Sequence, residues 1–181
     1  MSVRVDGLTP DENALVSHLQ DELLARSAHN KKRSRYYDAK HMIRQIGTTI
    51  PPMYQNMATV LGWAGKAVDG LANRCVLQRM VWADGDLDSL GMSELEDSNF
   101  LYSEFAQGRT DSLLHGVSFL VTTQGDTSAG EPAALVHAKS ALDGTGDWDS
   151  RKRALSNFYS VTSRDDQGEV TGFALYLDGE T

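Results

Sequence analysis

The sequence predicts an α+β fold, in which N-terminal helices precede a mainly antiparallel sheet. In the first part of the chain, apolar residues recur every three or four positions, which is the spacing of one helix face. After residue 116 the pattern changes to short runs rich in β-branched and aromatic residues, which are typical of strands. We therefore expect one domain over residues 1–181, helical over about 9–116 and β-rich over about 117–181.

The first helix has a well-marked start. Thr9 can cap it, Pro10 suits its first position, and Glu12, three residues after the cap, completes a capping box. A stripe of leucines at helical spacing follows. We expect this helix to continue to about Tyr37.

A second helix is expected after the break at Pro51-Pro52. Apolar residues between Met57 and Leu71 recur at helical spacing. Glycine weakens a helix by about 1 kcal/mol relative to alanine, so close packing against a neighbour should stabilise this segment. The glycines concerned are Gly62, Gly65 and Gly70.

Residues 74–82 are a short extended candidate. Beyond them, Ser93-Glu94-Leu95-Glu96 has the form of a second capping box, which should open a helical region reaching about His115.

The β-rich part should contain at least four strands. The expected strands cover residues 117–123, 133–138, 154–162 and 170–177. Residues 165–168 should form the turn of a hairpin, and residues 144–147 are a further turn. The chain stops directly after the last strand, which suggests a fragment of a longer protein.

Charge is segregated along the chain, whose net charge is −8. Residues 26–44 contain seven basic residues and one acid, whereas residues 84–104 contain seven acids and no base. The overall sign argues against a protein that coats nucleic acid with a uniformly basic surface. The single cysteine, Cys75, excludes an internal disulfide and favours a reducing compartment. We find no signal peptide or membrane span, so an intracellular protein is expected.

No constellation of catalytic, cofactor-binding or metal-binding residues is evident, so we expect no enzyme. Asp84-Gly85-Asp86-Leu87-Asp88 resembles the start of a calcium loop, but Ser89 and Leu95 replace the glycine and glutamate that the frame requires. The five histidines are scattered. We interpret Cys75 as a small buried residue beside the apolar Val76.

The stretch from Lys31 to Arg44 is the one candidate polyanion-facing feature. Lys31, Lys32, Arg33 and Arg35 could bind phosphates, and the interleaved tyrosines could stack on bases. The alternative is a helix end whose cations complement the helix dipole, with the tyrosines half-buried.

Five short motifs occur in a fixed order between Leu8 and Phe119. They are Leu8-Thr9-Pro10 with Glu12, Asn13 and Leu15; Tyr36-Tyr37-Asp38 with His41; Pro51-Pro52; residues 68–74 (VDGLANR); and Asn99 with residues 111–119 (DSLLHGVSF). In this order they resemble the portal proteins of tailed actinobacteriophages. The departures are Ala39, which replaces a glycine of that family's pattern, and the unusually acidic segment from Asp84 to Asp97.

The resemblance implies the N-terminal part of a portal wing domain. It implies a structural homo-oligomer, a ring at the capsid vertex of a virion, which is assembled in the host cytoplasm from a phage or prophage gene. Such a ring conducts double-stranded DNA and docks terminase, the head-tail adaptor and scaffold or capsid proteins, without a cofactor or a membrane. The alternative function is a non-enzymatic nucleic-acid-binding or phage head adaptor module that uses the stretch from Lys31 to Arg44.

Overall fold

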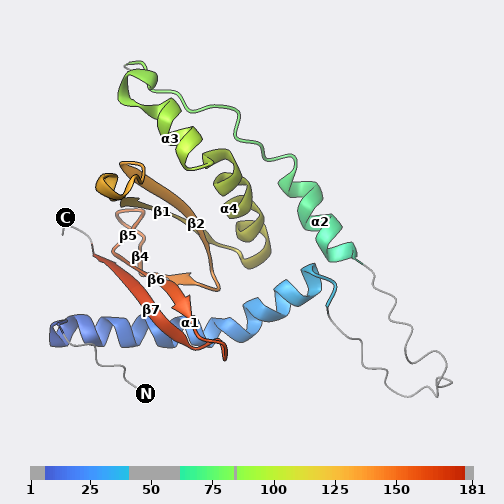
Figure 1. Cartoon of the computed structure of the whole chain (residues 1–181). Helices are drawn as coiled ribbons and strands as arrows, with labels where there is room; N and C mark the ends of the chain where they lie inside the picture. Colours follow the sequence, from blue (N-terminus) through green and yellow to red (C-terminus); the bar gives the residue numbers. More distant parts are fainter. Residues whose placement is uncertain (1–6, 41–61, 84, 178–181) are drawn as a thin grey trace.

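The computed structural model describes residues 7–40, 62–83 and 85–177. In this part of the chain, helices precede strands, and every strand pair is antiparallel (Figure 1). The α-helices are α1 (Pro10–Tyr37), α2 (Trp63–Ala72), α3 (Met92–Ser98) and α4 (Leu101–His115). The strands are β1 (Ser118–Gln124), β2 (Ala134–Ser140), β3 (Gly144–Thr145), β4 (Trp148–Asp149), β5 (Ala154–Leu155), β6 (Asn157–Arg164) and β7 (Val170–Leu177). The predicted α+β class is confirmed.

Helix α1 begins with the predicted capping box. The Glu12 backbone N–H donates to Thr9 Oγ1 at 3.3 Å, and the Thr9 backbone N–H donates to Glu12 Oε2 at 2.6 Å. The bond from the Thr9 N–H, together with one from the Thr9 hydroxyl to the same carboxylate oxygen at 2.7 Å, favours the charged form and lowers the pKa of Glu12. The helix ends at Tyr37, as the sequence predicts.

The central hydrophobic core forms where α1 crosses the sheet of β3, β6 and β7 (Figure 1). Val16, Leu19 and Leu23 lie on one face of α1 and are buried against the β6 residues Tyr159 and Val161. Burial of each such side chain stabilises the fold by about 1.5–3 kcal/mol. The β6–β7 hairpin that supplies this surface was predicted and is confirmed.

Helix α2 packs against the C-terminal end of α1. A Cβ atom at Gly65 would lie 3.0 Å from the Tyr37 carbonyl oxygen, so the glycine permits the close approach. This confirms the expected close packing at Gly65, whereas a Cβ at Gly62 or Gly70 would meet nothing within 4 Å. The part of the predicted helix from Met57 to Leu61 lies outside the described residues.

Three features between α2 and β1 differ from the sequence prediction. Residues 75–82 form no strand. The predicted capping box at Ser93 is wrong, because Gly91 is the N-cap of α3 and the Ser93 hydroxyl donates to Asp88 Oδ1 instead. The expected helical region to about His115 is present as two helices, because the chain is interrupted after Ser98, where Phe100 takes a left-handed φ of 49°.

The β-rich part also departs from prediction in detail. The expected strand over residues 154–162 is divided into β5 and β6, which belong to different sheets. Gly144 and Thr145, expected in a turn, pair as β3 with Ser160 and Tyr159.

The break between α3 and α4 places Asn99 against the free edge of β2. Asn99 Nδ2 donates to the Ala134 carbonyl at 2.9 Å, and Asn99 Oδ1 accepts from the Val136 N–H at 2.8 Å. Two residues further along β2, the Ala138 N–H donates to Glu104 Oε2. These side chains satisfy backbone groups that a neighbouring strand would otherwise bind, so they close this edge of the hairpin.

We expect Asn99→Ala to destabilise the protein by about 2 kcal/mol, because the Val136 N–H and the Ala134 carbonyl would lose their partner in a buried position. Urea denaturation followed by circular dichroism measures the change. The matched control is Ser98→Ala at the neighbouring exposed position. Equal stability of the two variants would contradict a role for Asn99 in holding β2.

Candidate polyanion-binding surface

Helix α1 divides the four predicted phosphate-binding cations between its faces. All four side chains are exposed. Lys31 and Arg35 are four residues apart and share one face, whereas Arg33 lies on the nearly opposite face. The structure therefore leaves Lys31, Lys32 and Arg35 on outward-facing parts of the helix and separates Arg33 from them.

Arg33 binds the end of helix α4. Its Nη1 donates to the His115 carbonyl oxygen at 2.8 Å. His115 is the last residue of α4, so its carbonyl lacks a partner within the helix. The guanidinium thus caps α4, which favours the structural interpretation for this one cation.

Two polar side chains of α1 complete this junction, and the sequence reasoning did not find them. Asn30, which is buried, donates from Nδ2 to the Ala141 carbonyl at 3.2 Å, and Ser34 Oγ lies 3.0 Å from His115 Nε2. The sequence does contain one sign of the burial of Asn30: it follows Leu23 by seven residues and therefore lies on the same face of α1 as the buried leucines.

Burial perturbs two titratable groups at the junction. Desolvation lowers the pKa of His115, against the opposing effect of nearby Asp111. Desolvation raises the pKa of Asp111, although nearby His115 opposes the change. The Ser34 hydroxyl that contacts His115 Nε2 also donates to the Asn30 carbonyl at 3.2 Å, and His115 Nδ1 has no hydrogen-bond partner among the described residues, so no carboxylate orients the imidazole and the group has the character of a structural contact.

The tyrosines that follow the cations have different environments. Tyr37 donates its hydroxyl to Asp69 Oδ1 at 2.7 Å, and this hydrogen bond raises the pKa of Tyr37. The contact joins the end of α1 to α2, so Tyr37 is committed to packing, whereas Tyr36 is 46% exposed. Ala39, where the resembling family has glycine, has a left-handed φ of 56°, a conformation that glycine adopts at little cost.

The interpretation of Cys75 as buried is wrong, because Cys75 is exposed and its neighbour Val76 is 64% exposed. The main chain leaves α2 there without entering the core, and Arg109 Nη1 donates to the Cys75 carbonyl.

The described residues contain no group of three His, Cys, Asp or Glu side chains that could hold a metal ion. Asp84, the first residue of the calcium-like loop, lies outside them. Asp86 and Asp88 instead accept local hydrogen bonds, from the Asp88 N–H at 3.1 Å and from Ser93. Of the helices in residues 7–40, 62–83 and 85–177, none is long and apolar enough to cross a membrane.

The sequence matches a family model described as phage portal protein, SPP1 Gp6-like, over residues 16–181. The chain belongs to this phage portal protein family. Portal proteins of two mycobacteriophages are similar to it. That of Mycobacterium phage L5 is 25% identical over 158 residues, and that of Mycobacterium phage D29 is 28% identical over 91 residues.

The match covers 81% and 50% of this portal chain but only 31% and 19% of the two relatives, respectively. The chain therefore spans less than a third of the length of these curated portal proteins. Residues of the motifs that suggested the family make tertiary hydrogen bonds. Tyr37 donates to Asp69, Asn99 accepts from the backbone of β2, and the His115 carbonyl accepts from Arg33. Portal membership places the chain in a family of structural proteins that form oligomeric rings in the capsid.

We expect a pH-dependent stability contribution from His115. Its pKa is lowered in the folded state, so the unfolded state binds more protons once the pH falls through the ordinary value near 6.5. The stabilisation is fully present above that value and is lost as the pH falls toward the lowered pKa. Urea unfolding at several pH values should therefore show wild type losing stability, relative to His115→Gln, below about pH 6.5.

The control for this measurement is His29→Gln, at an exposed position of α1. A difference between wild type and His115→Gln that does not change with pH would contradict the assigned direction of the shift.

Proposed function

We propose that this chain is the N-terminal wing part of a subunit in a portal ring at the capsid vertex. The ring forms the conduit through which double-stranded DNA enters and leaves the capsid, and it docks terminase and the head-tail connector. The observation that carries the proposal is the portal family match over residues 16–181. The subunit is assembled in the host cytoplasm and acts without chemistry of its own.

Two features of the structure support a conduit. The cations Lys31, Lys32 and Arg35 are exposed on α1, where they could contact phosphates from solvent. The chain as a whole carries a net charge of −8, which opposes strong attraction of a polyanion. DNA must slide through a conduit, so weak contacts with the backbone suit it better than base-specific ones.

The second candidate is a nucleic-acid-binding or head adaptor module. The exposure of Lys31, Lys32 and Arg35 favours it, since these cations are accessible to a phosphate backbone. Residues 41–44 of the same stretch lie outside the described residues. The two candidates differ in affinity for DNA and in assembly.

Electron microscopy of a longer portal polypeptide carrying this sequence tests the conduit. A closed ring with an axial channel wide enough for a DNA duplex is expected. A protein of that length that remains monomeric at assembly concentrations would contradict the proposal.

We expect the 181-residue chain alone to form monomers or small oligomers rather than a stable ring. Ring closure needs two complementary surfaces on each subunit, and much of a portal protein's length lies outside the matched region. Light scattering at micromolar concentration measures the particle size. A stable particle the size of a dodecamer would show that this part closes the ring by itself.

We expect weak DNA binding without sequence preference, which weakens steeply between roughly 50 and 200 mM salt as counterions compete. Fluorescence anisotropy with random and fixed-sequence duplexes at two salt concentrations measures it. Lys31→Glu with Arg35→Glu should remove the residual binding. The control, Arg74→Glu with Arg79→Glu, makes the same change in charge at exposed sites outside α1.

Tight binding at physiological salt that the Lys31 and Arg35 substitutions abolish would contradict the conduit and favour the adaptor. Equal effects of both double variants would show that only net charge matters.

A further inference from the structure

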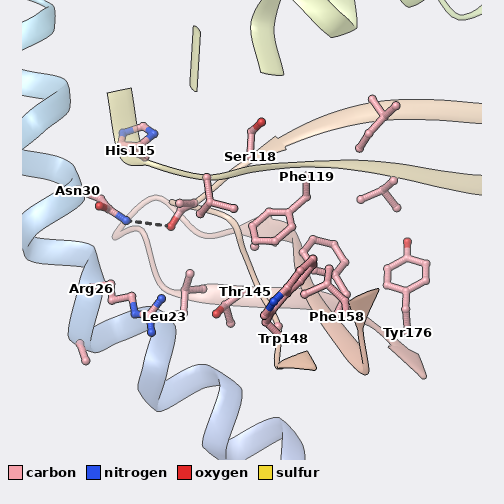
Figure 2. A pocket seen from close by; sticks show the side chains of 18 of the residues that line it. Leu23, Arg26, Asn30, His115, Ser118, Phe119, Thr145, Trp148, Phe158 and Tyr176 are labelled. Carbon is pink, nitrogen blue, oxygen red and sulfur yellow. Dashed lines mark hydrogen bonds between the residues drawn. The ribbon is translucent and has the colours of Figure 1, made fainter. Parts of the chain in front are cut away.

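An apolar groove of about 870 Å³ lies between α1, the β1–β2 hairpin and the sheet that contains β6 (Figure 2). Aromatic rings line one side of it. The Phe158 ring lies with its centroid 4.6 Å from that of Phe119 and 5.9 Å from that of Tyr176. The Trp148 side chain projects into the same space beside Phe158 (Figure 2).

Several large apolar side chains in the groove remain in contact with solvent. Trp148 is 62% exposed, Leu120 is 48% exposed and Val117 is 40% exposed. Apolar surface costs about 25 cal/mol for each Å² left in water, so a complementary apolar segment would gain by covering them. A contiguous exposed patch of this kind is a mark of an interaction site.

The groove follows the free edge of β1. Its lining includes every residue from Val117 to Thr122. Successive side chains of a strand point to opposite faces of the sheet, so a groove that touches six consecutive residues must be bordered by the backbone of β1 as well as by its side chains. In the described part of the chain, β1 pairs only with β2, which leaves the backbone groups of this edge unpaired.

The two edges of the hairpin differ. The free edge of β2 is closed by the side chains of Asn99 and Glu104. The free edge of β1 faces the apolar groove. An extended segment that pairs with β1 would bind the free backbone N–H and C=O groups of β1. At the same time it would bury its own apolar side chains in the groove, as in other cases of strand addition.

We propose that an extended apolar segment of the longer portal polypeptide, from outside these 181 residues, pairs with β1 and fills this groove. The two mycobacteriophage relatives have most of their length outside the match, so a portal polypeptide of that size has ample chain to supply it. A segment of the same polypeptide also has the advantage of high effective concentration over a separate partner. The inference rests on the proposed function, which places this chain in a longer portal subunit.

Hydrogen exchange read by mass spectrometry tests the proposal, with the 181-residue chain and the longer portal polypeptide compared. Alternate amides of β1 point away from β2. They should exchange rapidly in the 181-residue chain and roughly tenfold or more slowly in the longer polypeptide, before it assembles into rings. Val121→Lys, which places a charge on the face of β1 that Phe119 presents to the groove, should restore rapid exchange.

The matched control is Leu24→Lys, which introduces the same charge at an exposed leucine of α1 outside the groove lining. It should leave the protection unchanged. A second measurement avoids substitutions in the groove: when Trp63, Trp82 and any tryptophan of the added sequence are replaced by phenylalanine, Trp148 alone reports quenching by acrylamide in both proteins. Trp148 should be quenched less in the unassembled longer polypeptide than in the 181-residue chain.

Three outcomes would overturn the inference. In the first, the β1 amides exchange equally fast in both proteins. In the second, they are protected only after rings assemble, so that a second copy covers the groove. In the third, the longer polypeptide forms rings but its β1 edge still exchanges rapidly. The last outcome would leave the proposed function intact. Conversely, a protected β1 edge in a polypeptide that never forms rings would contradict the proposed function and support the inference.

Discussion

The contact between one face of α1 and the β6–β7 hairpin determines where the other elements lie. Val16 and Leu19 of α1 are fully buried beneath Tyr159, and Phe173 of β7 stacks on that tyrosine with ring centroids 5.0 Å apart. The Tyr159 hydroxyl is not left unpaired in this core, since Gln20 Nε2 donates to it at 3.1 Å. Because α1 is 28 residues long, its C-terminal half extends beyond this core and is available to the other helices.

Polar contacts then attach the remaining helices to that extension. Tyr37 joins α1 to α2 through Asp69, and Arg33 with Ser34 joins α1 to the end of α4. Helix α4 in turn carries Glu104, which with Asn99 holds the β1–β2 hairpin. Directional hydrogen bonds fix register and orientation where little apolar area is available, and they contribute about 1 kcal/mol each when well formed.

This arrangement gives the portal chain a small core and much exposed apolar surface. Large side chains such as Trp63, Phe100 and Trp148 are more than half exposed. In a family whose members assemble into rings, such surfaces are natural places for further chain or neighbouring subunits to pack. The cations of α1 also differ in their surroundings. Arg33 binds the end of α4 within the subunit, whereas Lys31 and Arg35 point toward solvent.

The sequence by itself determined features that depend on neighbouring residues. The capping box at Thr9, the extent of α1, the β6–β7 hairpin and the change from helix to strand follow from local spacing and turn chemistry. The family also followed from sequence, through motifs in a fixed order. Only the tertiary structure decided the break at Asn99, the exposure of Cys75, the pairing of β3 and the separation of Arg33 from the other cations. Three of these four depend on a partner far away in the chain: β2 for Asn99, β6 for Gly144 and α4 for Arg33. Local spacing carries no information about such partners, because the contacts form only when the packed core brings the elements together.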